Sequence, residues 1–393
     1  MTNRFFALPL LCAFGCAGLS NQLPSMAADA PSRAVAQPNQ VKEADDFPLS
    51  EGPYLAAYRW GAANKDGGAG ANKVFANWLQ RPVVWAEDFE PSDRWDNIEG
   101  GDWQLGEWND WKKEVAGRRL ILSVPLLPGG WDLSGPQAGA GAKQAVSLEA
   151  GAKGDYNAHF QKLAQNLVRY SLADSVLRLG WEFNGGWYAW RAKDNPKAFA
   201  DYWAQIVRTM RGVKGAEKLR FCWNPAMGWQ QFPSTQAWPG DEFVDIVGLD
   251  VYDDSWLKDT YPWPKDATPE VIEARRKKVW DEVIWNGSYG LKSWRDFAQQ
   301  HKKPFALPEW GVDKRGGGDD HGGLDNPTFI EQMHTFITDP GNKVLFHCYF
   351  DVQAPDGGHQ LSSGRAGTET TLFPLSSQKF KALFDGQAKA TGK

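Results

Sequence analysis

Short apolar runs recur along this chain at spacings that leave room for a helix between each pair, and this alternation constrains the fold more than any other feature. Apolar residues three and four positions apart in the intervening stretches are typical of amphipathic helices. Strands that alternate with helices predict a parallel sheet, and eight such units close into a single (β/α)8 TIM barrel of the α/β class. The predicted strands are Tyr54–Trp60, Pro82–Ala86, Arg119–Pro125, Ser175–Trp181, Leu219–Asn224, Val244–Val251, Pro304–Pro308 and Lys343–Val352.

The clearest helical patterns between these runs are Asn157–Tyr170, Pro196–Arg211 and Trp280–Gln300. Two glycine-rich segments, Ser134–Gly154 and Lys314–Gly323, are predicted to be long loops after the third and seventh strands. In TIM barrels the loops that follow the strands gather at one end and carry the functional residues. We therefore expect both segments on the functional rim.

The chain has 393 residues and a net charge of −5, which gives no sign of nucleic-acid binding. We expect one catalytic barrel domain over residues 49–386, since α/β barrels often use 250 residues or more as one unit. Residues 1–27 resemble a signal peptide, 28–48 a linker and 387–393 a tail. A secreted or periplasmic monomer without a transmembrane span is predicted, and lipid attachment at Cys16 is the alternative.

No cofactor is predicted, because no glycine-rich loop has the pattern that binds phosphates or dinucleotides. Asp319, Asp320 and His321 lie together in a glycine-rich loop, but they lack a second ligand group at zinc or calcium spacing, so no metal site is predicted. Cys222 and Cys348 fall in different predicted strands, and we expect both to be buried free thiols.

Two glutamates end predicted strands, where apolar runs give way to glycine and tryptophan. Glu182 closes the fourth strand and Glu309 the seventh, so a barrel would bring their carboxyl groups across one pocket. An unpaired buried carboxylate is costly, which suggests that the pair has a function. The chain also contains 21 tryptophans, whose flat faces suit the stacking of sugar rings. Together these features favour a carbohydrate-cleaving carboxylate pair.

The two glutamates are predicted to have different roles. Glu182 lies among Trp181, Phe183 and Trp187, where loss of solvent would raise the pKa of its carboxyl group and suit it to act as acid and then base. Glu309 must remain ionised to attack the anomeric carbon, and the Tyr252 hydroxyl could hold it charged and oriented by a hydrogen bond.

Three segments resemble glycoside hydrolase family 26, known for β-mannanases, within the clan of (β/α)8-barrel retaining glycosidases. Trp181–Trp190 is similar to the family's His-Glu-Met-Asn-Gly segment with its aromatic cluster, Val244–Tyr252 to its sixth strand, and Pro308–Gly311 to its nucleophile segment. The resemblance spans most of the mature chain. It implies that Glu182 is the acid/base, that Glu309 is the nucleophile and that Tyr252 positions Glu309.

The chain departs from the family at two places. Trp181 stands where the family has a histidine before the acid/base, and Ser123–Leu127, at the end of the third strand, lacks the usual histidine. In the family these residues touch the sugar being cleaved. Their replacement leaves the catalytic pair intact and weakens the transfer of mannan specificity.

Further candidates could bind or orient the substrate, and each has a structural alternative. Asn184 could bond the substrate or cap a turn, the tryptophans could line sugar subsites or pack in the core, and Asp250 and Arg59 could read hydroxyls or join an ion pair. The set is Asn184, Trp187, Trp190, Trp181, Trp310, Trp223, Asp250, Trp60 and Arg59.

Three functions fit these features. The leading one is a secreted retaining endo-β-glycanase that hydrolyses a polysaccharide or oligosaccharide built from β-linked mannan, glucan, xylan or an exopolysaccharide, by a two-glutamate double displacement. A non-catalytic glycan-binding barrel would keep the aromatic platforms without cleavage. An envelope transglycosylase would transfer the sugar to another sugar in place of water.

Overall fold

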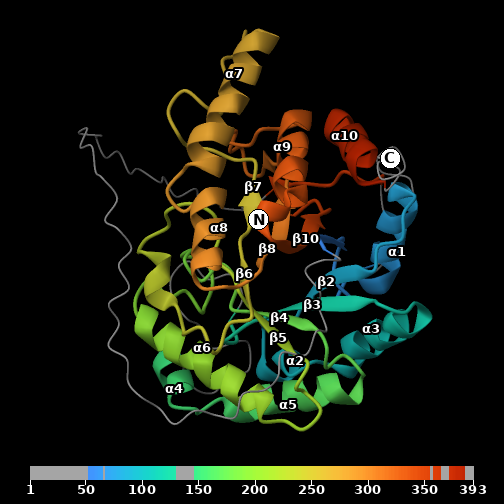
Figure 1. The fold of residues 1–393 in the computed structure, drawn as a ribbon, viewed down its shortest axis with the longest axis vertical. Helices are drawn as coiled ribbons and strands as arrows, with labels where there is room; N and C mark the ends of the chain where they lie inside the picture. The colour runs from blue at the N-terminus through green and yellow to red at the C-terminus, as the bar shows by residue number, and fades with distance from the viewer. Residues whose placement is uncertain (1–51, 65–66, 130–145, 355–356, 364–370, 386–393) are drawn as a thin grey trace, which may run out of the picture. The chain divides into compact units, whose positions relative to one another are not determined.

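The computed structural model describes residues 52–64, 67–129, 146–354, 357–363 and 371–385. Eight strands in that part of the chain pair in parallel around a closed ring, which confirms the predicted (β/α)8 barrel (Figure 1). Following the ring, they are β1 (Tyr54–Tyr58), β2 (Trp85–Phe89), β3 (Arg119–Val124), β4 (Val176–Leu179), β5 (Arg220–Trp223), β6 (Ile246–Gly248), β8 (Phe305–Gly311) and β10 (Val344–Phe350). Pairing of β10 with both β8 and β1 closes the ring.

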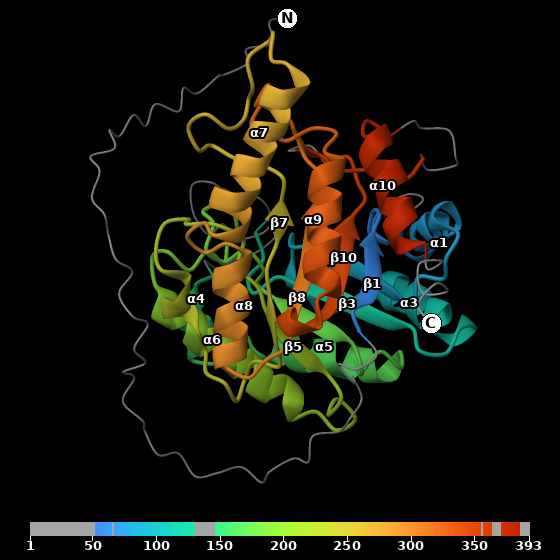
Figure 2. The ribbon, with the colours of Figure 1, turned by 45° about the horizontal axis from the view of Figure 1, so that its top comes forward.

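Helices follow the strands and cover the outside of the barrel. They are α1 (Gly68–Leu79), α2 (Trp95–Ile98), α3 (Asp102–Glu114), α4 (Leu148–Ala152), α5 (Asn157–Arg169), α6 (Pro196–Arg211), α7 (Pro269–Val279), α8 (Leu291–Gln300), α9 (Pro327–Thr338) and α10 (Pro374–Phe384). Outside β8 and β10, α9 lies between α8 and α10 (Figure 2). Within the described ranges, no helix has both the length and the apolar character needed to cross a lipid bilayer.

Local sequence explains where several helices begin. The side chain of Asn195 accepts a hydrogen bond from the amide of Ala198 at the start of α6, and Asn326 caps α9 in the same way. Both helices have proline in their first turn, where a missing N–H costs nothing. The prediction of Pro196–Arg211 is confirmed residue for residue, and that of Asn157–Tyr170 is confirmed to within one residue.

One predicted helix is wrong. Trp280–Gln300 is two segments, a π-helical turn at Trp280–Trp285 that continues α7, and α8 from Leu291. The chain turns tightly between them, and a Cβ atom added at Gly287 would lie only 2.1 Å from the carbonyl oxygen of Val283. The glycine permits a close approach that a continuous helix does not need.

Two further boundaries differ from the prediction. The second strand is Trp85–Phe89 rather than Pro82–Ala86, which points Glu87 into the barrel and Asp88 outward, where it accepts hydrogen bonds from Gln104 and Trp108 of α3. The loop predicted at 134–154 contains helix α4, capped by the hydroxyl of Ser147, while its residues 134–145 lie outside the described part. The predicted signal peptide 1–27 with Cys16, linker 28–48 and tail 387–393 also lie outside it.

The barrel interior below the functional rim is filled by a small apolar cluster that includes Trp85, Phe346, Cys222 and Cys348. Both cysteines are buried and free, as predicted. A larger cluster fills the layer between the strands and the helices. The packed interior leaves the carboxyl ends of the strands as the place where polar side chains converge.

Candidate active site

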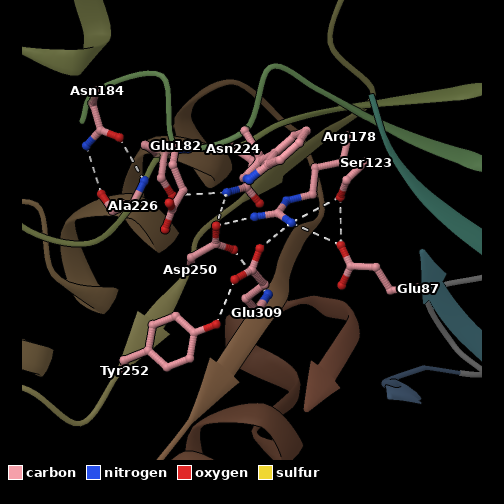
Figure 3. Close-up of polar contacts among 12 residues, drawn as sticks. Glu87, Ser123, Arg178, Glu182, Asn184, Asn224, Ala226, Asp250, Tyr252 and Glu309 are labelled. Carbon is pink, nitrogen blue, oxygen red and sulfur yellow. Dashed lines mark hydrogen bonds and ion pairs between the residues drawn. The ribbon is translucent and has the colours of Figure 1, made fainter. Parts of the chain in front are cut away.

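The guanidinium of Arg178, on β4, lies at the centre of the site (Figure 3). Its Nη1 donates to Glu309 Oε1 at 2.5 Å and to Glu87 Oε1 at 3.0 Å, and its Nη2 donates to the carboxylate of Asp250. Arg178 and Glu87 have no exposed side-chain surface. One buried cation therefore holds carboxylates from β2, β8 and the segment after β6.

Glu309, on β8, is held by donors to both of its carboxylate oxygens. The hydroxyl of Tyr252, in the short strand β7 (Val251–Tyr252), donates to Glu309 Oε2 at 2.6 Å, while Arg178 serves Oε1. Burial, followed by the negative charge of Glu309, raises the pKa of Tyr252 well above its usual range, so the phenol keeps its proton. Charge-assisted hydrogen bonds of this kind are short and strong and hold a carboxylate in one orientation.

Glu182 lies in the tight turn after β4 and is only partly buried. Its backbone is in the left-handed region, with φ 51°, and its amide donates to the carbonyl of Asn224 at 2.8 Å. The indole N–H of Trp187 donates to Glu182 Oε2 at 2.9 Å. A non-glycine residue at positive φ is strained, and such strain concentrates at functional sites.

The carboxyl groups of Glu182, Asp250 and Glu309 converge, and one oxygen from each lies within 4.8 Å of the others. The two predicted catalytic glutamates therefore face each other despite their separation in sequence. An upper limit of 4.8 Å between these oxygens fits the separation of about 5–5.5 Å between the carboxyl groups of retaining glycosidases better than the about 6.5–9.5 Å of inverting ones.

Asp250 lies behind this pair and joins its parts. It binds Arg178, its Oδ2 accepts from Asn224 Nδ2 at 3.0 Å, and its Oδ1 accepts from the amide of Glu309 at 3.1 Å. The sequence left two roles open for Asp250, binding of sugar hydroxyls or an ion pair, and the structure shows it paired with a buried arginine. That arginine is Arg178.

The site contains more buried acid than its one guanidinium neutralises. Burial raises the pKa of Glu87 to about 7, against the opposite effect of Arg178, and the charge of Glu309 raises it further. Burial likewise raises the pKa of Asp250 well above its usual range. Ser123 Oγ donates to Glu87 Oε1 at 2.9 Å. Ser123 lies at the end of the third strand, in the segment that lacks the histidine usual in family 26.

The predicted sugar-stacking tryptophans divide into two groups. Trp190, Trp223 and Trp310 have no exposed surface and Trp181 is 5% exposed, so these four pack in the core. The indole N–H of Trp181 donates to the hydroxyl of Tyr188 at 2.8 Å and is therefore engaged within the protein. Trp187 and Trp60 are partly exposed at the strand ends.

Asn184 and Arg59 are both engaged with other parts of the protein, Asn184 by a link between two loops rather than by a turn cap. Asn184 is buried and exchanges two hydrogen bonds with the backbone of Ala226, at 2.9 and 2.8 Å, which fasten the loop after β4 to the segment after β5. Arg59 pairs with Asp351 at 3.1 Å and is 3% exposed.

The predicted loop residues Asp319 and His321 bond to each other, with His321 Nδ1 2.7 Å from Asp319 Oδ1. Among the described residues, the group of carboxylates and imidazoles close enough to share a metal ion is Glu182, Asp250 and Glu309. In that group the guanidinium of Arg178 already contacts two of the three carboxylates.

Sequence reasoning missed Arg178, Glu87 and Asn224. The signal for Arg178 was present, because a charged residue inside an apolar strand needs a buried partner. Glu87 was missed since the second strand was placed three residues too early.

Comparison with known proteins agrees with this arrangement. The sequence profile of glycosyl hydrolase family 26 matches residues 140–266, which include Arg178, Glu182 and Tyr252. A mannan endo-1,4-β-mannosidase from Bifidobacterium adolescentis is 29% identical over 120 residues, which make up 28% of this chain and 12% of that protein. The resemblance to family 26 is therefore confirmed.

Solved structures give the same fold at low sequence identity. An endo-β-1,4-mannanase from Cellulomonas fimi superposes with a TM-score of 0.54 and 17% identity, over 85% of this chain and 70% of that one. The catalytic domain of a family 26 endo-β-1,4-mannanase from Bacillus sp. JAMB-750 superposes with a TM-score of 0.55 and 15% identity, over 84% of this chain and 85% of that one.

Proposed function

We propose that this chain, which resembles glycoside hydrolase family 26 in sequence and shares the fold of mannanases, is a retaining endo-β-glycanase. The observation that carries the proposal is the facing pair of carboxyl groups from Glu182 and Glu309, whose oxygens lie within 4.8 Å of each other. The substrate proposed first is β-1,4-linked mannan, since the similar proteins named above act on it.

The different surroundings of the two glutamates support a division of labour. Glu309 is 6% exposed, and Arg178 and Tyr252 donate to its two oxygens and fix its orientation, which suits a nucleophile. Glu182 is more exposed and accepts a hydrogen bond from Trp187, so its carboxyl group can exchange protons with a leaving group and with water.

The reaction then proceeds in two displacements. A carboxylate oxygen of Glu309 forms a bond to the anomeric carbon while the glycosidic C–O bond breaks, and Glu182 donates its proton to the leaving oxygen. Glu182 next removes a proton from water, whose oxygen attacks the anomeric carbon and releases the sugar from Glu309. Two inversions retain the β configuration, and both carboxyl groups regain their starting states.

Substitution of each glutamate tests the proposal. Glu309→Gln and Glu182→Gln should each lower kcat on β-mannan at least about 10³-fold, because either change removes a group needed in the transition state. Glu217→Gln, at an exposed site, is the matched control and should retain activity. Reducing-end release measures turnover, and circular dichroism checks that each variant is folded.

Azide separates the two roles. With a Glu309→Ala variant, azide can replace the nucleophile in one displacement and give an α-glycosyl azide. With Glu182→Ala and a substrate with a good leaving group, azide attacks the glycosyl-enzyme and gives the β-glycosyl azide. The opposite pattern would reverse the assignments, and full activity of either Gln variant would overturn the proposal. Binding of β-mannan without cleavage by the unaltered chain would favour a non-catalytic glycan-binding barrel.

A further inference from the structure

Trp256 is the most exposed tryptophan in the described part of the chain, at 58%. It lies four residues after Tyr252, in the loop that follows β7, and its backbone neighbour Ser255 donates to the carbonyl of His321 at 2.9 Å. Single exposed apolar side chains are common and by themselves carry no function. The surroundings of this ring are what distinguish it.

Two side chains brace the indole of Trp256. The imidazole of His321 stacks on it, with ring centroids 5.4 Å apart and an interplanar angle of 21°, and the guanidinium carbon of Arg315 lies 5.3 Å from its centroid. Asp319 links the two braces, since it lies 3.4 Å from Arg315 Nε and 2.7 Å from His321 Nδ1. More than half of the residue's surface stays exposed, so the side chain is both held and accessible.

A cavity of about 240 Å³ lies next to the groups that brace this ring. Arg315 belongs to both, because it lies against Trp256 and also lines the cavity. The wall combines an aromatic ring with several polar groups, which is how proteins orient small polar ligands. The lining residues are Pro262, Trp263, Lys265, Lys314, Arg315, Asp319, Asp320, Gly322 and Leu324.

A chain of contacts connects Trp256 with the nucleophile. The rings of Tyr252 and His359 lie 4.5 Å apart, His359 Nδ1 is 3.6 Å from Asp313 Oδ1, and Asp313 Oδ2 is 3.6 Å from Arg315 Nη1. Trp256 therefore lies on the same rim of the barrel as Glu309, beyond the residues that touch the catalytic carboxylate.

From these observations we propose that Trp256, with the adjoining cavity, forms a remote subsite for a sugar unit of a β-linked polysaccharide. The exposed indole stacks on the sugar ring, and the charged and polar wall binds its hydroxyl groups. This inference rests on the proposed function, since the subsite would hold a polymer whose cleaved bond lies at Glu182 and Glu309. A braced ring loses little conformational freedom on binding, which favours affinity.

Comparison of long and short substrates tests the subsite. In Trp256→Ala, KM for long β-mannan should rise about tenfold, which corresponds to the loss of one aromatic stacking contact, while kcat changes little. Trp256→Tyr keeps a flat ring and should restore most of the affinity. Leu257→Ala is the matched control, because Leu257 is the next residue and is also exposed, at 40%. Short oligosaccharides that reach only the catalytic glutamates should show no change in any variant.

Binding measured in a Glu309→Gln background distinguishes failure of the subsite from failure of the proposed function. Weaker retention of Glu309→Gln/Trp256→Ala than of Glu309→Gln in gels containing β-mannan supports the subsite even if the unaltered chain does not cleave the polymer. Equal retention, or an equal effect of Leu257→Ala, overturns it. Equal loss on long and short substrates would also overturn it, since that result places Trp256 in the cleavage site.

Discussion

At the residue scale, the charge balance around Arg178 explains how the site is built. One guanidinium is shared by Glu87, Asp250 and Glu309, and breaking such a buried group by removing one partner is strongly destabilising. Glu182 and Glu309 could be predicted from the sequence, because each ends a strand and carries a recognisable motif. Their buried partners could not, since the pairing of Arg178 with Glu87 depends on strand register.

Glu87 should make stability depend on pH. Its pKa in the folded protein is about 7, above the ordinary value of 4.5, so the folded state binds the proton more tightly. The stability due to this carboxyl group is then fully present below about pH 4.5 and is lost as pH rises through 7, by at most roughly 3 kcal/mol. Glu87→Gln stays neutral and should gain in Tm relative to the unaltered chain as pH rises from 5 to 8.

Thermal unfolding across that pH range, followed by circular dichroism, measures the effect. Glu217→Gln is the control, because Glu217 is exposed and its pKa is lowered by hydrogen bonds from backbone amides. Parallel curves of Tm against pH for Glu87→Gln and the unaltered chain would show that Glu87 is ionised in the folded protein throughout.

At the scale of the elements, periodicity located all eight barrel strands, β2 three residues too early, and two helices to within one residue. It failed where the chain makes close contacts that no local pattern encodes, as at Gly287, which interrupts a stretch with continuous helical periodicity. Strand β2 was misplaced because Glu87 and Asp88 are buried polar residues, one facing the barrel interior and the other helix α3, and a search for apolar runs stops before them.

The turn after β4 depends on Gly180. Its φ is 55°, and an added Cβ atom would lie 2.4 Å from a methyl carbon of Leu126. Gly180→Ala should therefore lower stability by roughly 2–4 kcal/mol, from backbone strain together with overpacking. It should also lower kcat, because Glu182 lies two residues further along the same turn.

Gly117→Ala separates the two causes. Gly117 also has a positive φ, 82°, but no neighbouring atom lies within 4 Å of the added Cβ position. Only the backbone term, about 1 kcal/mol, applies there, and kcat should not change. Denaturant unfolding with parallel activity assays compares the variants. Equal losses of stability at both positions would show that the contact with Leu126 is relieved at little cost.

At the scale of the whole molecule, helix α10 packs against the outside of the barrel. Phe380 and Phe384 of this helix pack against Trp310, the residue after Glu309, with ring centroids 5.9 and 6.1 Å away. The rings of Phe380 and Tyr349 are 5.0 Å apart. The last helix therefore supports strands β8 and β10 behind the catalytic site.

Deletion of residues 374–393 should abolish stable folding, whereas deletion of 387–393, the predicted tail, should leave Tm and kcat unchanged. The single change Phe380→Ala should cost about 3–5 kcal/mol, because it removes a buried aromatic ring. Solubility, Tm and activity on β-mannan measure the effect of each. A soluble, active chain ending at 373 would show that α10 is not needed to support β8.

The two halves of the barrel contribute different kinds of groups to the site around Arg178. The half that ends with β4 supplies the cation, Glu87 and Glu182, the proposed proton donor, and the half that begins with β5 supplies Asp250, Tyr252 and Glu309, the proposed nucleophile. Neither half alone therefore contains all the groups of the site. A chain divided between β4 and β5 would be a split enzyme, whose activity would report the reunion of its fragments.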